Sequence, residues 1–174
     1  MPEIKTENRG ALTEYAALIQ AADGLTLSQI CAVCSLEPST VQNWIKRGFV
    51  PRPERKKYHG RHLARILLIS RLREGMQIDR VGELLRYING DTDDTGDDII
   101  SEEELFDLFN RMCVLLRERM PEPDSAADIA AQIMSGYPAD PDSGEKIAKA
   151  LGVMACAYMA SLYKQKTEEL FKEL

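Results

Sequence analysis

The sequence predicts a mainly α-helical protein in which a basic N-terminal segment is joined to a C-terminal bundle of helices. Most of the 174 residues fall in stretches whose apolar side chains recur at helical spacing. Residues 25–90 hold 12 Lys and Arg against 5 Asp and Glu, a balance of +7 in a chain of net charge −6, so the remainder carries −13. Residues 48–60 interrupt the helical pattern with Gly and Pro, which forbids a central strand but allows a small β ribbon.

The first predicted helix covers residues 11–22. Leu12, Tyr15 and Ile19 share one face of it, and Asp23-Gly24 ends it. We interpret residues 1–24 as an N-terminal helix that packs on the bundle.

Two short helices around a tight turn follow. Thr26 or Ser28 can cap the first helix, which runs to about Cys34. Pro38 suits the first turn of the second helix, over residues 38–47, because its missing N–H needs no partner there. Val41, Trp44 and Ile45 face inward, and we interpret Trp44 as a core residue. The outward side chains are those of Ser39, Thr40, Gln42, Asn43 and Lys46.

The ribbon and two further helices complete a predicted unit over residues 25–90. Helical periodicity resumes near Arg61, stops at Gly75, returns at Asp79 and ends at Asn89-Gly90. We expect His62 to be a surface or helix-start residue rather than a ligand.

An acidic block follows this unit. Residues 91–104 hold eight acidic residues and no basic one. We interpret 91–100 as a solvated acidic linker, and Ser101 with Glu104 as a capping box for the next helix. A second hypothesis is that these carboxylates fold back on the basic ribbon and compete with a polyanion bound there.

Residues 101–174 predict a helical bundle that serves dimerisation, effector binding or both. Helices are expected over 101–120 and 125–135, and from Glu145 nearly to the end. The middle of the last helix is apolar all round, so it must be buried on several sides. It is either a two-fold interface or the central helix of a monomeric bundle.

The 25–90 unit resembles the winged helix-turn-helix of MerR-type transcription regulators. The resemblance is carried by an ordered set of segments: Thr26-Leu27-Ser28 through Cys34-Ser35, Ser39-Thr40-Val41 to Trp44, Lys46-Arg47-Gly48-Phe49-Val50-Pro51, Lys56-Lys57-Tyr58 and Leu72 to Ile78. The whole chain also resembles the uncharacterised bacterial domain-of-unknown-function family 1836. It departs from the MerR pattern at Gln42 and Asn43, where that family usually has Arg and an aromatic residue. An acidic loop also follows the unit, where MerR proteins run directly into a dimerising coiled coil.

The resemblance implies a sequence-specific, DNA-binding transcription regulator. Its recognition helix, residues 38–47, would enter the major groove, and its basic wing, residues 48–60, would lie on phosphates. The expected base-reading residues are Ser39, Thr40, Gln42, Asn43 and Lys46. The expected phosphate-binding residues are Arg47, Arg52, Arg55, Lys56, Lys57, Tyr58, His59 and Arg61, with Tyr58 half buried and its hydroxyl available to a phosphate.

Two other functions remain open. The chain could be a protein-interaction module that keeps the helix-turn-helix fold but presents its basic face to an acidic protein, or an excisionase-like architectural protein. The expected partners are double-stranded DNA, a second copy bound through the C-terminal helices, and an unknown small-molecule effector.

Catalysis and cofactors are not expected. The sequence lacks a G-x-S-x-G motif, a Gly-rich phosphate loop and a His/Asp/Glu set at metal-ligand spacing. Cys31 and Cys34 form a C-x-x-C without a second ligand pair, so we interpret them as small buried apolar residues, as we do Cys113 and Cys156.

The expected location is the cytoplasm. No stretch approaches the roughly 18 to 20 uncharged apolar residues that span a membrane, and the N-terminus lacks the apolar core of a secretory signal.

Overall fold

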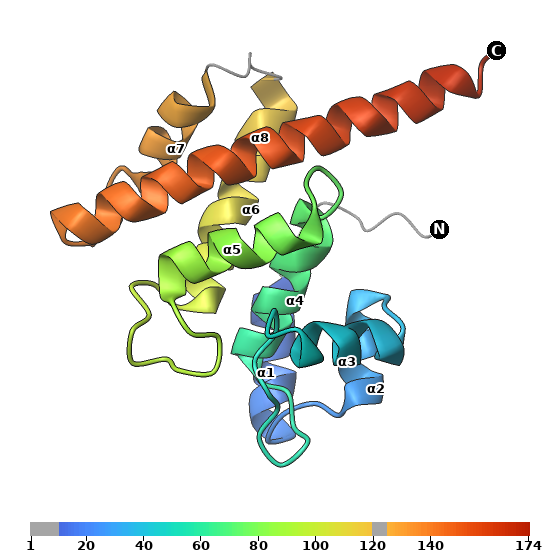
Figure 1. Cartoon of the computed structure of the whole chain (residues 1–174), viewed down its shortest axis with the longest axis vertical. Helices are drawn as coiled ribbons and strands as arrows, with labels where there is room; N and C mark the ends of the chain where they lie inside the picture. Colours follow the sequence, from blue (N-terminus) through green and yellow to red (C-terminus); the bar gives the residue numbers. More distant parts are fainter. Residues whose placement is uncertain (1–10, 120–124) are drawn as a thin grey trace.

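The computed structural model of the protein describes residues 11–119 and 125–174. These residues form eight helices, which confirms the mainly α-helical prediction. The helices, shown in Figure 1, are α1 (Ala11–Ala21), α2 (Leu27–Cys34), α3 (Pro38–Lys46), α4 (Gly60–Leu72), α5 (Ile78–Asn89), α6 (Glu102–Arg119), α7 (Ala126–Met134) and α8 (Pro141–Phe171). Residues 1–10 of the predicted N-terminal unit lie outside the described residues.

Helices α2 and α3 begin where their capping residues predict. The Thr26 hydroxyl accepts the Gln29 backbone N–H, and the Gln29 side chain accepts the Thr26 N–H at 2.8 Å, which closes a capping box. Ser35 ends α2 in the left-handed conformation, with φ of 53°. Pro38 is the first residue of α3. The tight turn between the two helices thus follows from local chemistry.

The small β ribbon predicted for residues 48–60 does not form strands in the described part of the chain. Two isolated antiparallel bridges are present instead, Leu25 with Tyr58 and Glu54 with Lys57. Pro51 and Pro53 have no N–H to donate, so a hydrogen-bonded ladder cannot extend along this segment. The segment is a hairpin whose register is set by its tip and by its attachment to Leu25.

Helix α4 is the central element of the fold. It packs against α1, α2, α5, α6 and α8, and it buries apolar side chains on most of its circumference. The buried side chains of the basic segment and of the C-terminal helices therefore form one continuous core. Gly75, just after α4, approaches the Ala157 carbonyl of α8 so closely that an added Cβ would lie 1.8 Å from the oxygen.

A buried polar junction crosses this core at Arg65 of α4. Arg65 is 1% exposed and donates from Nε to the Phe49 carbonyl at 2.9 Å. One Nη donates to Glu102 Oε1 at 2.5 Å, and the other donates to Thr92 Oγ1 at 3.3 Å. The Thr92 hydroxyl in turn donates to the Gly48 carbonyl at 2.9 Å. One side chain thereby joins the start of the hairpin, the acidic loop and the first turn of α6.

The C-terminal helices form the predicted bundle. Helices α6, α7 and α8 pack on one another, and the end of α8 extends beyond the other helices in Figure 1. The middle of α8 is buried by its own chain through Ile147, Leu151, Met154 and Tyr158, among others. In this stretch α8 is a central helix of the bundle, which is one of the two predicted alternatives. None of the described helices is long and apolar enough to cross a membrane.

We expect Glu102→Ala to lower the free energy of unfolding by about 3 to 5 kcal/mol, because it leaves the buried Arg65 charge uncompensated. The measurement is urea denaturation followed by circular dichroism. Glu83→Ala removes the exposed ion pair with Arg80 and serves as the control, with an expected change of about 0 to 1 kcal/mol. Equal effects of the two substitutions would contradict the assignment of Arg65 as the junction of the fold.

Candidate nucleic-acid interface

Helix α3 presents a polar surface to solvent. Val41 and Trp44 are buried beneath it, and the Arg73 guanidinium lies 5.4 Å from the centre of the Trp44 ring. Trp44 is therefore a core residue, as predicted. Of the predicted base-reading side chains, Thr40 is half buried and four are exposed: Ser39, Gln42, Asn43 and Lys46. The helix thus offers hydroxyl, amide and ammonium groups along one accessible face.

The tip of the 48–59 hairpin is a two-residue turn made of cations. The Lys57 N–H donates to the Glu54 carbonyl at 2.8 Å, which encloses Arg55 and Lys56. Both have positive φ, 48° and 64°, which is the backbone of a type I′ turn. Asn and Gly adopt positive φ readily and are the preferred residues of this turn, whereas Arg and Lys are strained there. The chain therefore accepts strain to place two exposed positive side chains at the tip.

The other predicted phosphate-binding cations make contacts within the protein. Arg47 pairs with Asp79 of α5 and lies over the Phe49 ring, 4.5 Å from its centre. Lys57 Nζ donates to the Ala22 and Gly24 carbonyls, each at 3.2 Å. Arg61 is half buried and donates to the Thr92 carbonyl at 3.4 Å. These side chains hold the hairpin to its surroundings. Among the candidate DNA-contacting cations of the described residues, Lys46, Arg55 and Lys56 form no ion pair within 4.0 Å and remain exposed.

Tyr58 and His62 are both buried, because the hairpin folds tightly onto the first turn of α4. Tyr58 is buried rather than half buried, at 4% exposure, and its ring meets that of His62 edge-on at 5.5 Å. His62 starts α4 as predicted but is buried, at 1% exposure, not on the surface. Its Nδ1 accepts the His59 N–H at 2.9 Å. Burial lowers the pKa of His62, so the neutral ring is favoured.

The acidic loop lies against the base of the hairpin. The Asp93 carboxylate accepts the Arg52 backbone N–H at 2.8 Å and lies 3.6 Å from Arg52 Nε. Thr92 adds the hydrogen bonds to Gly48, Arg61 and Arg65. Contact between this loop and the basic ribbon is thus part of the structure, while competition with a polyanion stays a prediction. The Ser101–Glu104 capping box is also present, as predicted.

Sequence reasoning missed Arg65, Thr92 and Asp93, which set where the hairpin sits. Their signal was weak, since a buried arginine in a basic segment looks like a surface cation. The cysteine interpretation agrees with three of four positions: Cys31, Cys34 and Cys113 are buried and Cys156 is exposed. Burial raises the pKa of Cys34 to about 12, which favours an inert thiol.

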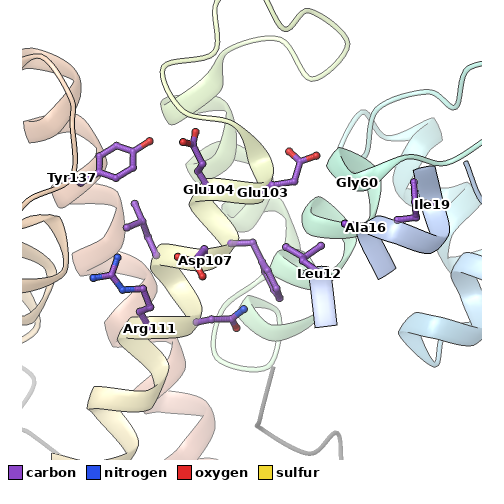
Figure 2. Close-up of a pocket in the computed structure, with 12 residues that line it drawn as sticks. Leu12, Ala16, Ile19, Gly60, Glu103, Glu104, Asp107, Arg111 and Tyr137 are labelled. Atoms are coloured by element: carbon purple, nitrogen blue, oxygen red, sulfur yellow. The ribbon is translucent and has the colours of Figure 1, made fainter. Parts of the chain in front are cut away.

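A separate cavity of about 540 Å³ lies between α1 and α6. Leu12, Ala16 and Ile19 of α1 line one side of the cavity. Figure 2 shows the carboxylates of Glu103 and Glu104 from α6, and the ring of Tyr137, on its other side. Burial raises the pKa of Tyr137, and so does its hydrogen bond to Glu104.

The sequence of the chain matches one known protein family. The chain matches the family described as Domain of unknown function (DUF1836) over residues 22–109, half of its length, and it belongs to that family. The matched region continues past Gly90 through the acidic loop into α6, so both partners of the Arg65–Glu102 pair lie within it. Neither the curated proteins nor the solved structures give a match.

Replacing the hairpin tip by Asn-Gly should stabilise the protein. We expect Arg55→Asn with Lys56→Gly to raise the free energy of unfolding by about 1 to 2 kcal/mol, because Asn and Gly adopt positive φ with less strain. Thermal and urea unfolding measure this change. The charge-preserving swap Arg55→Lys with Lys56→Arg keeps two side chains of the same kind in the turn and should leave stability unchanged. A loss of stability in the Asn-Gly variant would show that the tip is not strained.

Proposed function

We propose that the chain is a sequence-specific DNA-binding transcription regulator of the MerR-like winged helix-turn-helix type. In this proposal α3 enters the major groove and the 48–59 hairpin is the wing that lies on the phosphate backbone. The proposal also assigns the chain double-stranded DNA as its partner and the cytoplasm as its location.

The strained cationic tip is the observation that carries the proposal. A hairpin needs no cation at these two positions, and Asn-Gly would close it at lower cost. A guanidinium group and an ammonium group held side by side at such a site favour a partner with regularly spaced negative charges, and duplex DNA is such a partner. Strain kept at an exposed position is typical of a functional site.

The four exposed side chains of α3 supply a means of reading sequence. Gln42 and Asn43 can each pair bidentately with adenine, while Lys46 can reach guanine or a phosphate. Arg55 and Lys56 would then position the protein without specifying sequence, together with Arg52, whose side chain stays 83% exposed beside Asp93. Arg47, Lys57 and Arg61 are bound to other parts of the chain, so we now assign them to positioning the wing, together with the buried Tyr58 and the half-buried His59.

The alternatives differ in partner. An acidic protein would use the same cations without any need for Gln42 and Asn43, and an excisionase-like protein would bind DNA as an architectural element.

The proposed small-molecule effector would bind in the cavity between α1 and α6, whose size is within the roughly 300 to 1,000 Å³ range of small-molecule sites.

Removing the two tip cations tests the phosphate role. Arg55→Ala with Lys56→Ala should weaken binding to all duplexes alike, and the slope of log K against log salt should become shallower by about two, because about 0.9 counterions are released per phosphate contact. Fluorescence anisotropy with random and genomic duplexes at several salt concentrations measures both quantities. Lys149→Ala with Lys172→Ala removes the same charge from exposed positions on α8 and its C-cap, outside the proposed dimer row, and should leave the slope unchanged.

Gln42→Ala tests base reading in the same assay. It should change the preferred sequence at one base pair, at a cost of about 1 to 3 kcal/mol, and leave the salt slope unaltered. If no duplex binds better than random DNA and Gln42→Ala has no effect, the interaction module becomes the better function.

The second half of α8 supports a second copy of the chain as a further partner. Positions three and four residues apart form one exposed row along it: Cys156, Ala160, Tyr163, Thr167 and Leu170. Apolar residues with this 3–4 spacing form the contact row of a two-stranded coiled coil. Four of the five are apolar or aromatic, and Thr167 is the exception. We therefore propose that this row, rather than the buried middle of α8, forms a homodimer suited to a palindromic site.

Leu170→Asp should shift the dimer toward monomer, because it places a charge within the row. Sedimentation velocity over a range of concentrations measures the change in dimer dissociation constant, expected to be tenfold or more, on the order of 1.4 kcal/mol. Gln165→Asp adds the same charge to the same helix outside the row and should leave the constant unchanged. A wild-type chain that is monomeric at all concentrations would contradict the proposal.

A further inference from the structure

A buried histidine joins both sides of the outer hairpin, residues 52–59, to the start of α4. His62 is 1% exposed, and its ring meets the Tyr58 ring edge-on at 5.5 Å. Its Nδ1 lies 2.9 Å from the His59 backbone nitrogen, where the hairpin ends. Its Nε2 lies 3.2 Å from the Arg52 carbonyl oxygen, where the chain leaves for the tip. One imidazole ring thus bonds to backbone on either side of the cationic tip.

The two backbone groups determine which ring nitrogen carries the proton. The His59 N–H can only donate, so Nδ1 accepts and is unprotonated. The Arg52 carbonyl can only accept, so Nε2 carries the hydrogen and donates it. The ring is therefore neutral and in the Nε2–H form, because no other protonation state makes both bonds.

Protonation of the ring is opposed by its surroundings. A hydrogen on Nδ1 would point at the His59 N–H, so two donors would face each other across 2.9 Å. Burial has the largest effect and lowers the pKa of His62, while the hydrogen bond to Arg52 raises it in part. The nearby Arg61 and His59 lower the pKa further, and the Glu54 carboxylate has the smallest effect, which raises it.

Other ionisable groups lie near this place on the loop, on α6 and on α2. Asp93 of the loop accepts the Arg52 N–H, and Glu103 of α6 lies against Gly60. Cys31 of α2 is buried, and burial raises the pKa of its thiol, which keeps it neutral. The charged groups that shift the pKa of the His62 ring are therefore the three in the hairpin and on α4.

Mild acid weakens the attachment of the outer hairpin. Because the folded pKa of His62 lies below its ordinary value of about 6.5, stability falls as the pH drops below that value. The fall ends once the pH has passed the folded pKa. Arg65 keeps its charge throughout, so its bonds to the Phe49 carbonyl and to Glu102 still hold the hairpin base to the bundle. The loss is therefore confined to the outer hairpin.

We propose that His62 is the positioning residue of the wing: its neutral ring holds residues 52–59 against α4, and its protonation releases them, so that binding of duplex DNA weakens in mild acid. The release concerns the hairpin alone, whereas the effect on DNA rests on the proposed function. The direction is opposite to that of simple charge attraction. A protein that gains positive charge in acid ordinarily binds a polyanion more tightly.

His62→Gln separates protonation from structure. A glutamine three residues after the N-cap can accept the N-cap N–H, and its amide nitrogen can donate to the Arg52 carbonyl, but it does not titrate. Amide hydrogen exchange at Lys57 and Tyr58, whose N–H groups bond across the hairpin and to Leu25, measures the release. From about pH 7.5 to about pH 5.0, we expect protection to fall about tenfold or more in the wild-type chain and less than about threefold in His62→Gln. Duplex affinity, measured by fluorescence anisotropy at constant salt, should follow the same pattern.

His59→Gln is the matched control, since it makes the same substitution at the half-buried neighbouring imidazole and should keep the wild-type pH response. Long-range ¹H–¹⁵N spectra of the wild-type imidazoles need no variant. They should show His62 in the Nε2–H form at about pH 7.5 and its loss together with hairpin protection.

The inference is overturned if Nδ1 of His62 carries a proton at about pH 7.5, if hairpin protection is unchanged down to about pH 5.0, or if His62→Gln keeps the full response. It is also overturned if the hairpin opens while duplex affinity does not fall. A chain whose hairpin responds as expected but which binds no duplex at about pH 7.5 would support the positioning role of His62 and refute the DNA-binding function.

Discussion

The buried guanidinium of Arg65 is the interaction on which the arrangement of this protein depends. It lies inside the core of α4, where an unpaired charge would cost several kcal/mol, and it is matched by Glu102 from α6. Its other donors meet the Phe49 carbonyl and the Thr92 hydroxyl. The hairpin, the acidic loop and the bundle therefore have a fixed relation to one another. A set of apolar contacts alone would allow these parts to slide, whereas directional hydrogen bonds define one position.

This junction has a consequence for the proposed interface. The hairpin tip is strained and exposed, so it needs a rigid base if its cations are to meet a partner at a defined spacing. Arg65, Lys57 and the Thr92 hydroxyl supply that base, each bonding to backbone carbonyls on or beside the hairpin. Buried and half-buried cations hold the hairpin backbone, while Arg55, Lys56 and the polar face of α3 remain accessible. In the proposed regulator, the first group positions the second.

Helix boundaries were largely predictable from the sequence because they depend on local chemistry. Thr26, Pro38 and Asn89-Gly90 act on their immediate neighbours, and each stands where a helix begins or ends. The outward face of α3 was predictable for the same reason. What periodicity could not predict was the environment of α4, which neighbours cover on most sides. A helix surrounded in this way buries polar residues as well as apolar ones, so the burial of Arg65 and His62 left no signal in the periodicity.

The errors at the candidate sites share that cause. Charge counting treats every Lys and Arg of the basic segment as available, yet Arg47, Lys57 and Arg61 are engaged by partners far along the chain. The acidic loop was interpreted as a solvated linker, yet Thr92 and Asp93 bond to the hairpin and to Arg65. Tertiary contacts between segments 30 or 40 residues apart decide these roles, and no local pattern encodes them.

The central claim is that the exposed face of α3 and the hairpin tip form one DNA-binding surface. Nuclear magnetic resonance of the ¹⁵N-labelled chain, titrated with a duplex selected for tight binding, tests it most directly. The account predicts that amide shifts concentrate at Ser39, Gln42, Asn43, Arg55 and Lys56, while α7 and the end of α8 are unaffected. Shifts confined to other helices, or no shift with any selected duplex, would contradict it.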